Sequence, residues 1–439
     1  MIEKIIKKET TGIVWFGNDL RIHDNQVLVK AVQSHKKIIA VYCINPSLFD
    51  KNQFGFKKMD IFRTQFLLET LKDLQQLLFK KNISFLVYLD APENKIKSIC
   101  DTYQVDRIFK QKEWTSEEVN STKAVQEAVS KDIKIEEIYN QFLYHPEDIK
   151  TEIQNIPQVF SNLRKKLEKY IIIRPEVDFP KLAEENLVSE TTHIPTLEEV
   201  GFETFNQNSK SAFPFKGGET EALNRINDYF FQTKKLEFYK KTRNGLVGTD
   251  YSSKFSPWLA NGSLSARTIY WNVKKFEQEE TKNQSTYWLI FELIWRDYFK
   301  YISMKHGNDI FKIGGILQKQ YEWSNHQKQI QQWINGETKD DFVNANMIEL
   351  KETGWMSNRG RQNVASYFSK ELNLDWRIGA SYFESLLLDY DVHSNYGNWM
   401  YVSGVGNDPR DRKFNTQLQA DRYDSNHSFR KLWLQQTLF

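Results

Sequence analysis

The stretch GIVWFGNDLRIHDN, residues 12–25, decides the fold class of this chain. Its first five residues are apolar, β-branched or aromatic, apart from Gly12, as is typical of a buried strand that ends in a turn. Four more runs of this kind follow, at residues 37–44, 83–89, 105–109 and 133–138. Helical patterns separate the five runs, at residues 25–35, 59–80, 92–103 and 116–130. The alternation predicts a doubly wound, five-stranded parallel sheet, Rossmann-like in its order.

The helix predicted at residues 59–80 has the clearest pattern. Its apolar stripe follows helical spacing and consists of Leu67, Leu71, Leu74 and Leu78. The first strand-to-helix turn, in contrast, contains Gly17 but lacks the G-x-G-x-x-G fingerprint. The sequence therefore predicts this sheet without a dinucleotide in the usual crevice.

The rest of the chain reads differently from its first 140 residues. Six of the ten prolines fall in residues 141–215, which predicts a connector with short helices. Beyond residue 217 strand signals nearly vanish. Helical patterns follow one another at residues 219–233, 265–279, 287–305, 327–335, 343–351, 362–372 and 378–388. We therefore predict an α/β domain at residues 1–140, a connector at 141–215 and an all-α domain at 216–439.

The composition of the chain limits the classes of protein to which it can belong. Ten of the 12 Trp lie beyond residue 250, and residues 231–320 hold 15 Lys and Arg against 8 Asp and Glu. A basic region rich in aromatic residues is typical of a surface that binds single-stranded nucleic acid, although a solvated charged face is as good a reading. Two cysteines, Cys43 and Cys100, are too few for a disulfide framework. With no signal peptide and no apolar run of about 18 residues, we expect a cytoplasmic protein with no membrane span.

Several familiar catalytic motifs are absent. The sequence contains neither a G-x-x-x-x-G-K-[ST] phosphate loop nor H-E-x-x-H, and its eight His are scattered. Asp389 and Asp391 could bind Mg²⁺, but no third acidic residue lies nearby in the sequence. We therefore predict no metal site.

A hydroxyl-rich segment, TDYSSKFSPWL at residues 249–259, contains the first candidate binding site. Ser256 followed by Pro257 predicts an N-cap and the first position of a helix. Free N–H groups at a helix start, flanked by hydroxyls and Lys254, can bind phosphate. Ser-Pro also begins many helices with no ligand, so the segment alone does not decide between these readings.

Three later segments concentrate polar side chains among apolar ones. Glu292 and Arg296 are four residues apart in a predicted helix and can pair on one face, which Trp295 shares. Residues 355–366 gather two Arg and three amide side chains around a glycine at a helix start. Residues 388–399 read as a helix end followed by a polar, aromatic loop. Each pattern fits either the wall of a ligand-binding site or polar side chains that cap a helix and face solvent.

Two longer motifs identify a family. Residues 356–366 (MSNRGRQNVAS) and 404–410 (GVGNDPR), with Phe414-Asn415 and Tyr423-Asp424 after them, resemble the photolyase/cryptochrome family, most closely its cryptochrome DASH branch. The resemblance extends from Trp15 to Asp424.

The resemblance implies FAD, bound in a U shape within the all-α domain. The phosphate and ribityl contacts would be Tyr239, Ser252, Ser253, Phe255 and Ser256. The remaining contacts would be Glu292, Arg296, Asn358, Arg361, Asp389, Asp391 and Asn395, with Asn395 facing the ring nitrogen N5. On this reading Asp389 and Asp391 hold a flavin instead of a metal ion.

The implied reaction is that of a deoxyribodipyrimidine photolyase. Excited reduced FAD donates an electron to a cyclobutane pyrimidine dimer, which splits and returns the electron. The residues implied at the reaction site are Glu292, Trp295, Gln362, Asn395 and Tyr401. Gln362 stands where relatives that act on duplex DNA carry Met, so single-stranded DNA is the expected partner, bound by a monomer.

The resemblance also implies an electron path and a second chromophore. Trp399, Trp376 and Trp323 match the family's electron-transfer chain to the flavin. Glu113 matches a carboxylate that contacts a folate antenna, 5,10-methenyltetrahydrofolate, between the domains. Residues 139–145 (YNQFLYH) keep only the last three letters of the expected WGSTLYH pattern, so the antenna stays an open question.

Three other functions compete with dimer repair. A blue-light photoreceptor would use the same flavin, but the chain ends about fifteen residues after Asp424, without a long signalling tail. A (6-4) photoproduct photolyase needs His beside the lesion, and His393 is the one nearby candidate. A nucleic-acid-binding flavoprotein without catalysis, such as a transcription regulator, is also compatible with the basic region.

Overall fold

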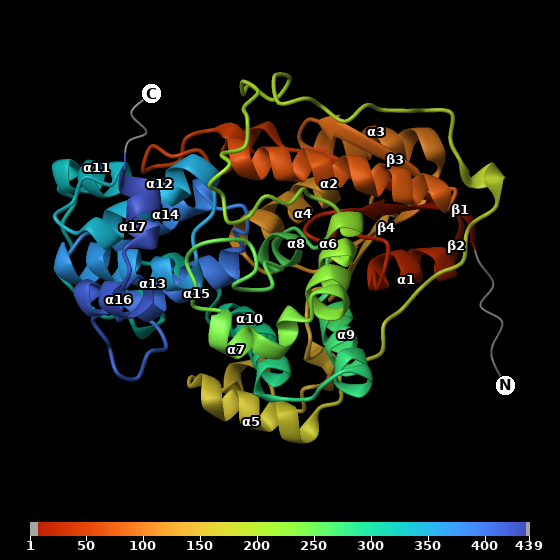
Figure 1. Ribbon diagram of the computed structural model, residues 1–439. Helices are drawn as coiled ribbons and strands as arrows, with labels where there is room; N and C mark the ends of the chain where they lie inside the picture. Colours follow the sequence, from red (N-terminus) through yellow and green to blue (C-terminus); the bar gives the residue numbers. More distant parts are fainter. Residues whose placement is uncertain (1–7, 436–439) are drawn as a thin grey trace.

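A computed structural model describes residues 8–435 and contains the predicted parallel sheet (Figure 1). Its strands are β1 (Lys8–Trp15), β2 (His35–Ile44), β3 (Ser84–Leu89), β4 (Val105–Gln111) and β5 (Lys134–Ile138). They are arranged in the order β3-β2-β1-β4-β5, and every neighbouring pair is parallel. Four helices connect them: α1 (Gln26–Ser34), α2 (Ile61–Lys80), α3 (Pro92–Tyr103) and α4 (Ser116–Ala128). The predicted fold class is confirmed.

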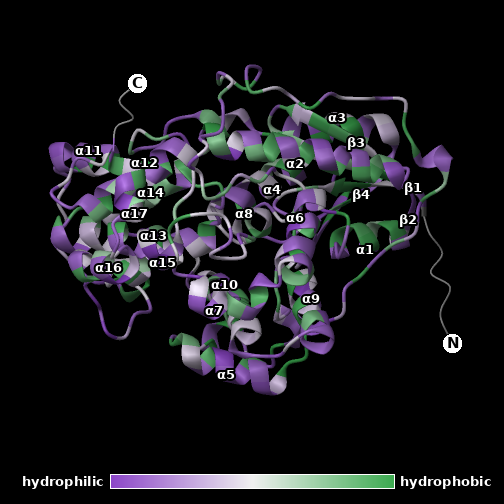
Figure 2. Ribbon diagram, viewed as in Figure 1, coloured by the Kyte–Doolittle hydropathy of each residue, from purple (hydrophilic) through white to green (hydrophobic). Residues whose placement is uncertain are grey.

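Alternation along the strands supplies a core on each face of the sheet. Val14 belongs to one core together with Leu28 of α1 and Leu71 of α2. Its neighbour Ile13 belongs to a second core with Ile96 of α3 and Val125 of α4. Successive side chains of a strand point to opposite faces, which explains why both faces need helices. The helix α2 shows both hydrophobic and hydrophilic residues along its length in Figure 2, as an amphipathic covering helix should.

The chain between residues 141 and 215 runs around both parts of the molecule (Figure 1). It contains one longer helix, α5 (Phe160–Tyr170), and several 3₁₀ turns. Phe179 and Leu197 pack into the core beside the sheet, whereas Phe213 belongs to the helical core. This segment therefore contributes apolar side chains to both cores.

The remaining described residues form a helical region, as predicted. Its helices are α6 (Glu219–Ile226), α7 (Tyr239–Thr242), α8 (Ser256–Ala260), α9 (Ala266–Glu279), α10 (Gln284–His306), α11 (Gln327–Asn335), α12 (Asp341–Thr353), α13 (Asn358–Ser366), α14 (Trp376–Leu386), α15 (Val392–Ser403), α16 (Thr416–Tyr423) and α17 (Ser428–Leu434). The long helix α10 begins with a capping box at Asn283 and Thr286 and buries residues along most of its length. None of the described helices is long and apolar enough to cross a membrane.

The predicted loop at residues 388–399 is wrong, because most of it is the helix α15. Asp391 is the N-cap of this helix and accepts a hydrogen bond from the Ser394 N–H at 2.8 Å. Polar and aromatic residues on α15 hide the usual apolar period, and the Asp391 N-cap is the sequence signal that marks its start. The helix places Asn395 and Trp399 one turn apart on the same face.

The turn after β1 docks the helical region onto the sheet. The buried Arg21 guanidinium donates to the Gly262 carbonyl at 2.9 Å, and buried Asp24 pairs with Arg267 at 2.6 Å. Gly262 has a φ of +73°, and a Cβ there would overlap the backbone at Asn18. This turn therefore holds the sheet and the helical region together. Its side chains are occupied by these contacts, and it lacks the fingerprint that binds a dinucleotide.

Candidate functional site

A cavity of about 520 Å³ opens within the helical region, and we call it the helical cavity. Eleven of the twelve predicted FAD contacts line it: Tyr239, Ser252, Ser253, Phe255, Ser256, Glu292, Arg296, Asn358, Arg361, Asp389 and Asp391. The twelfth, Asn395, lines an adjoining recess of about 80 Å³, which shares Asn358 and Arg361 with the helical cavity. Segments far apart in the sequence thus meet at one site of ligand size.

The hydroxyl-rich turn forms one wall of the helical cavity. Lys254 adopts a left-handed backbone with φ of +64°, and the Arg225 guanidinium donates to the carbonyls of Ser252 and Ser253, both at 3.3 Å. The predicted N-cap at Ser256 is off by one residue, because Phe255 is the N-cap and Ser256 begins α8. Pro257 therefore follows the first helical residue, where its missing N–H costs no helical hydrogen bond.

Glu292 and Arg296 both face the helical cavity but do not pair with each other. Glu292 Oε1 accepts from Arg243 Nη2 at 2.9 Å, whereas Arg296 donates to the carbonyls of Gln141 and Leu259 at 2.5 and 3.1 Å. The predicted pair is wrong because tertiary partners from other segments outcompete a neighbour on the same helix. Burial raises the pKa of Glu292, and the Arg243 cation opposes that effect.

The two aspartates of the D-x-D pair each have a separate cation. Asp389 pairs with Arg361 at 3.0 Å, and Asp391 pairs with Lys300 at 2.9 Å. Burial alone would raise the pKa of Asp391, but Lys300, His393 and Arg296 together outweigh burial and hold that pKa well below its usual range. No cluster of three or more His, Cys, Asp or Glu that could hold a metal ion exists among residues 8–435.

Three side chains predicted to contact a lesion lie together on the helical cavity: Trp295, Gln362 and Tyr401. Trp295 stacks on Phe160 with centroids 3.7 Å apart, and its ring meets Tyr401 edge-on at 6.0 Å. The side-chain oxygen of Gln362 accepts from Arg359 at 3.0 Å. Two rigid aromatic faces beside an amide give a surface on which flat, polar rings can stack.

Two tryptophans of the predicted electron path lie on helices, Trp376 on α14 and Trp399 on α15, and the third, Trp323, lies in the loop before α11. Trp399 is 2% exposed and lines the recess that holds Asn395, while Trp376 is fully buried at the start of α14. Gly379, one turn after Trp376, packs directly on the Trp399 ring, where a Cβ would overlap the indole. Trp323 is partly exposed, and the next residue pairs with the backbone just before Trp376. The predicted path would therefore run from the recess toward the surface.

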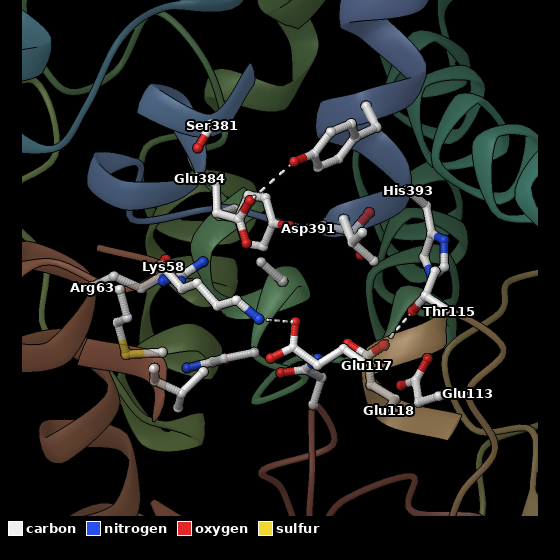
Figure 3. Close-up of a pocket in the computed structure, with 18 of the residues that line it drawn as sticks. Lys58, Arg63, Glu113, Thr115, Glu117, Glu118, Ser381, Glu384, Asp391 and His393 are labelled. Carbon is white, nitrogen blue, oxygen red and sulfur yellow. Dashed lines mark hydrogen bonds and ion pairs between the residues drawn. The ribbon is translucent and has the colours of Figure 1, made fainter. Parts of the chain in front are cut away.

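A second cavity, of about 390 Å³, lies between the sheet and the helical region (Figure 3), and we call it the interdomain cavity. Glu113 lines it from the loop after β4 and accepts from Gln111 at 2.7 Å. Figure 3 shows Glu118 beside Glu113, whereas Glu384 lies toward the opposite corner of the cavity and Lys58 reaches across to pair with Glu117 at 2.6 Å. Arg296 and Asp391 also line the helical cavity, so the two cavities share part of a wall.

The partly buried Glu113 makes a testable contribution to stability. Burial raises its pKa from 4.5 to about 7, so between these pH values the folded chain binds more protons than the unfolded chain. The free energy of unfolding should therefore fall as pH rises through this window, by about 3 kcal/mol from this group. In the FAD-free protein, Glu113→Gln should remove that fall in urea titrations.

The matched control for this prediction is Glu127→Gln. Glu127 lies on α4, and its side chain is 68% exposed beside Lys123. Its replacement should leave the slope of stability against pH unchanged. An identical slope in wild-type protein and Glu113→Gln would contradict the assignment.

The sequence matches family models and proteins of known family. A family model for DNA photolyase matches residues 12–183, and a model for the FAD binding domain of DNA photolyase matches residues 288–437. A protein named Cryptochrome DASH from Synechocystis is 44% identical over 429 residues, which cover 97% of this chain and 87% of that protein. The chain belongs to the photolyase/cryptochrome family, in its cryptochrome DASH branch.

Two further relatives agree with this DASH assignment. Cryptochrome DASH of Arabidopsis thaliana, named chloroplastic/mitochondrial, is 42% identical, with 98% of this chain and 77% of that protein covered. A crystal structure of a Synechocystis cryptochrome superposes with a TM-score of 0.92 at 43% identity, covering 98% and 89% of the two chains. The family prediction from residues 356–366 and 404–410 is confirmed.

FAD is the cofactor of this DASH chain, and the helical cavity fits it. The Lys254 ammonium lines that cavity, is buried, and has no hydrogen-bond partner among the described residues. Its amine lies over the Tyr251 ring at 3.2 Å, and burial lowers its pKa well below the usual range. An anionic pyrophosphate beside it would favour the charged form. Ser252, Ser253 and Arg361 add hydroxyl and guanidinium donors on the same cavity.

Sequence reasoning missed two charged residues of this DASH site, Arg243 and Lys300, and it placed Lys254 beside a phosphate without predicting its burial. Arg243 lies four residues after Tyr239 in a basic segment, and Lys300 lies four residues after Arg296 on α10. Helical spacing from a residue already singled out could have found both. The burial of Lys254 could not have been read from the sequence, because it follows from a left-handed turn.

Proposed function

We propose that this protein splits cyclobutane pyrimidine dimers with light, and that it prefers dimers in single-stranded DNA. The observation that carries the proposal is that Glu292, Trp295, Gln362 and Tyr401 share the helical cavity with the predicted flavin contacts. A lesion and a flavin would therefore meet in one cavity, which electron transfer requires. Membership of the photolyase family supports the same reaction class.

The flavin contacts would hold the cofactor from several sides. Ser252, Ser253 and Lys254 would bind the phosphates. Asp389 and Asp391, which pair with Arg361 and Lys300, would hydrogen-bond to the flavin and ribose. Reduced FAD, when bound and excited by light, supplies an electron to the dimer and takes it back, so no net oxidation occurs. Asn395 would face N5, where hydrogen bonding tunes a flavin's electronics.

The lesion would stack between aromatic rings and hydrogen-bond to Glu292. Trp295 is held in place by its 3.7 Å stack on Phe160, and Tyr401 accepts a hydrogen bond from Arg412 at 3.0 Å. Both rings are therefore positioned before a lesion arrives, which lowers the entropic cost of binding it. The Arg243 guanidinium fixes the Glu292 carboxylate on the cavity wall.

Gln362 supports the preference for single strands. Its amide oxygen is occupied by Arg359, so its NH₂ group remains to donate into the helical cavity. When a lesion flips out of a duplex, it leaves a gap between the neighbouring base pairs. The polar Gln362 side chain is less suited than the apolar side chain of Met to fill that gap. In single-stranded DNA no base pairs must be broken, and flipping a lesion avoids a few kcal/mol of unpairing cost.

The proposal is tested by following dimer loss under light in two forms of the same DNA. The reduced holoprotein receives dimer-containing DNA, either as a single strand or annealed to its complement. We expect faster loss in the single strand and a smaller difference between the two forms in Gln362→Met. Equal rates in both forms would contradict the preference, and no loss in either would favour a photoreceptor.

A further inference from the structure

Tyr396 lies beside the predicted electron path. It contacts a tryptophan of that path and is hydrogen-bonded to a carboxylate. Its ring meets Trp376 edge-on with centroids 6.2 Å apart, and it also packs on Phe311 at 4.8 Å. Its hydroxyl donates to Glu384 Oε2 at 3.1 Å. A tyrosine in contact with an indole and hydrogen-bonded to a carboxylate has the parts needed for coupled electron and proton transfer.

Glu384 is suited to accept that proton. It lies on α14, two turns after Trp376, and faces the interdomain cavity (Figure 3). Tyr396 lines the same cavity. Burial raises the pKa of Glu384, which strengthens it as a base, and the Arg63 cation opposes this and favours the ionised form. Arg63 itself lies over the Tyr390 ring at 4.6 Å.

We propose that Tyr396 is a redox-active tyrosine that reduces oxidised Trp376 while passing its phenolic proton to Glu384. The proposal rests on the electron path through Trp399 and Trp376. Its oxidant is the Trp376 indole radical cation, formed when light drives an electron along that path to oxidised flavin. A phenol gives up an electron readily only if its proton leaves too, and a base within hydrogen-bond reach accepts it.

The step balances in electrons and protons. One electron moves from Tyr396 to the Trp376 radical cation, and one proton moves from the tyrosine Oη to Glu384 Oε2. The products are a neutral indole, a neutral tyrosyl radical and a carboxylic acid. The positive charge on the buried Trp376 is thereby cancelled by the carboxylate. The radical comes to lie on the wall of the interdomain cavity, away from the flavin recess.

Electron paramagnetic resonance of the illuminated, oxidised holoprotein tests this step. With ring-deuterated tyrosine incorporated, the trapped radical should show the altered hyperfine pattern of a tyrosyl radical. Tyr396→Phe keeps the ring contact and removes the proton, and Glu384→Gln keeps the shape and removes the base. Both variants should lose the tyrosyl signal and retain only tryptophan signals.

Tyr390→Phe is the matched control, because Tyr390 hydrogen-bonds the same carboxylate but its ring faces Arg63. It should keep the tyrosyl signal. A tyrosyl signal that persists in both Tyr396→Phe and Glu384→Gln, or that is missing in wild-type protein, would overturn the inference. Bound-flavin absorbance reports folding of each variant, and Glu384→Gln decides the matter if Tyr396→Phe fails to fold.

Trp399→Phe separates this inference from the path on which it depends. If Trp399→Phe loses every radical signal and Tyr396→Phe leaves the tyrosyl signal unchanged, only the role of Tyr396 is wrong. If radical signals persist in Trp399→Phe, the path itself is wrong.

Discussion

Replacing Trp399 with Phe is expected to abolish rapid photoreduction of oxidised flavin in the purified holoprotein. Trp399 lines the recess with Asn395 and is 2% exposed, so it is placed to donate the first electron of the path. Phenylalanine fills much of the same space in the core but is far harder to oxidise. The measurement is flavin absorbance against time under blue light, with a thiol as the final reductant.

Trp333→Phe is the matched control for this prediction. Trp333 is fully buried and meets Trp399 edge-on at 6.2 Å, yet its indole N–H is engaged by the Val364 carbonyl within the core. Its replacement should change stability and leave photoreduction close to wild type. Photoreduction at the wild-type rate in Trp399→Phe would contradict the assigned path. Chemically reduced Trp399→Phe should still repair dimers, because repair uses a flavin that is already reduced.

Replacing Glu292 with Gln is expected to lower repair and spare photoreduction, the reverse of the first prediction. The change removes the charge that Arg243 holds on the cavity wall at 2.9 Å. A hydrogen bond to a charged group contributes about 1.5–3 kcal/mol, which corresponds to roughly a ten- to hundredfold loss. The measurement is the number of dimers split per absorbed photon at saturating DNA.

Glu279→Gln serves as the control for Glu292→Gln. Glu279 ends α9, its side chain is 52% exposed, and it contacts Lys275 at 4.0 Å on the surface. That variant should repair like wild-type protein. A Glu292→Gln variant that splits dimers as efficiently as wild type would remove Glu292 from the reaction site.

The sheet could be predicted almost completely, because strand and helix periods differ and alternate cleanly over residues 12–140. The helix α15 could not, because Asn395, Trp399 and their neighbours face a cavity, and a functional face does not show the apolar stripe of an ordinary helix. The family resemblance, which does not depend on periodicity, singled out both residues.

The members of the candidate site were easier to predict than their partners. Glu292 and Arg296 were correctly expected to share one helix face, and both line the helical cavity. Their pairing was predicted wrongly, because the ionic partner of Glu292 is Arg243, 49 positions away in the sequence. Spacing along one helix reports which side chains share a face, whereas partners from other segments depend on tertiary packing.

The most direct test of the central claim is light-dependent loss of dimers from a single-stranded oligonucleotide by the reduced holoprotein. One sample is illuminated and an identical sample is kept in the dark, and intact dimers are counted in both. The account predicts that dimers disappear in the light alone and that intact pyrimidines replace them in equal amount. Dimers that persist in the light, with FAD bound and reduced, would contradict it.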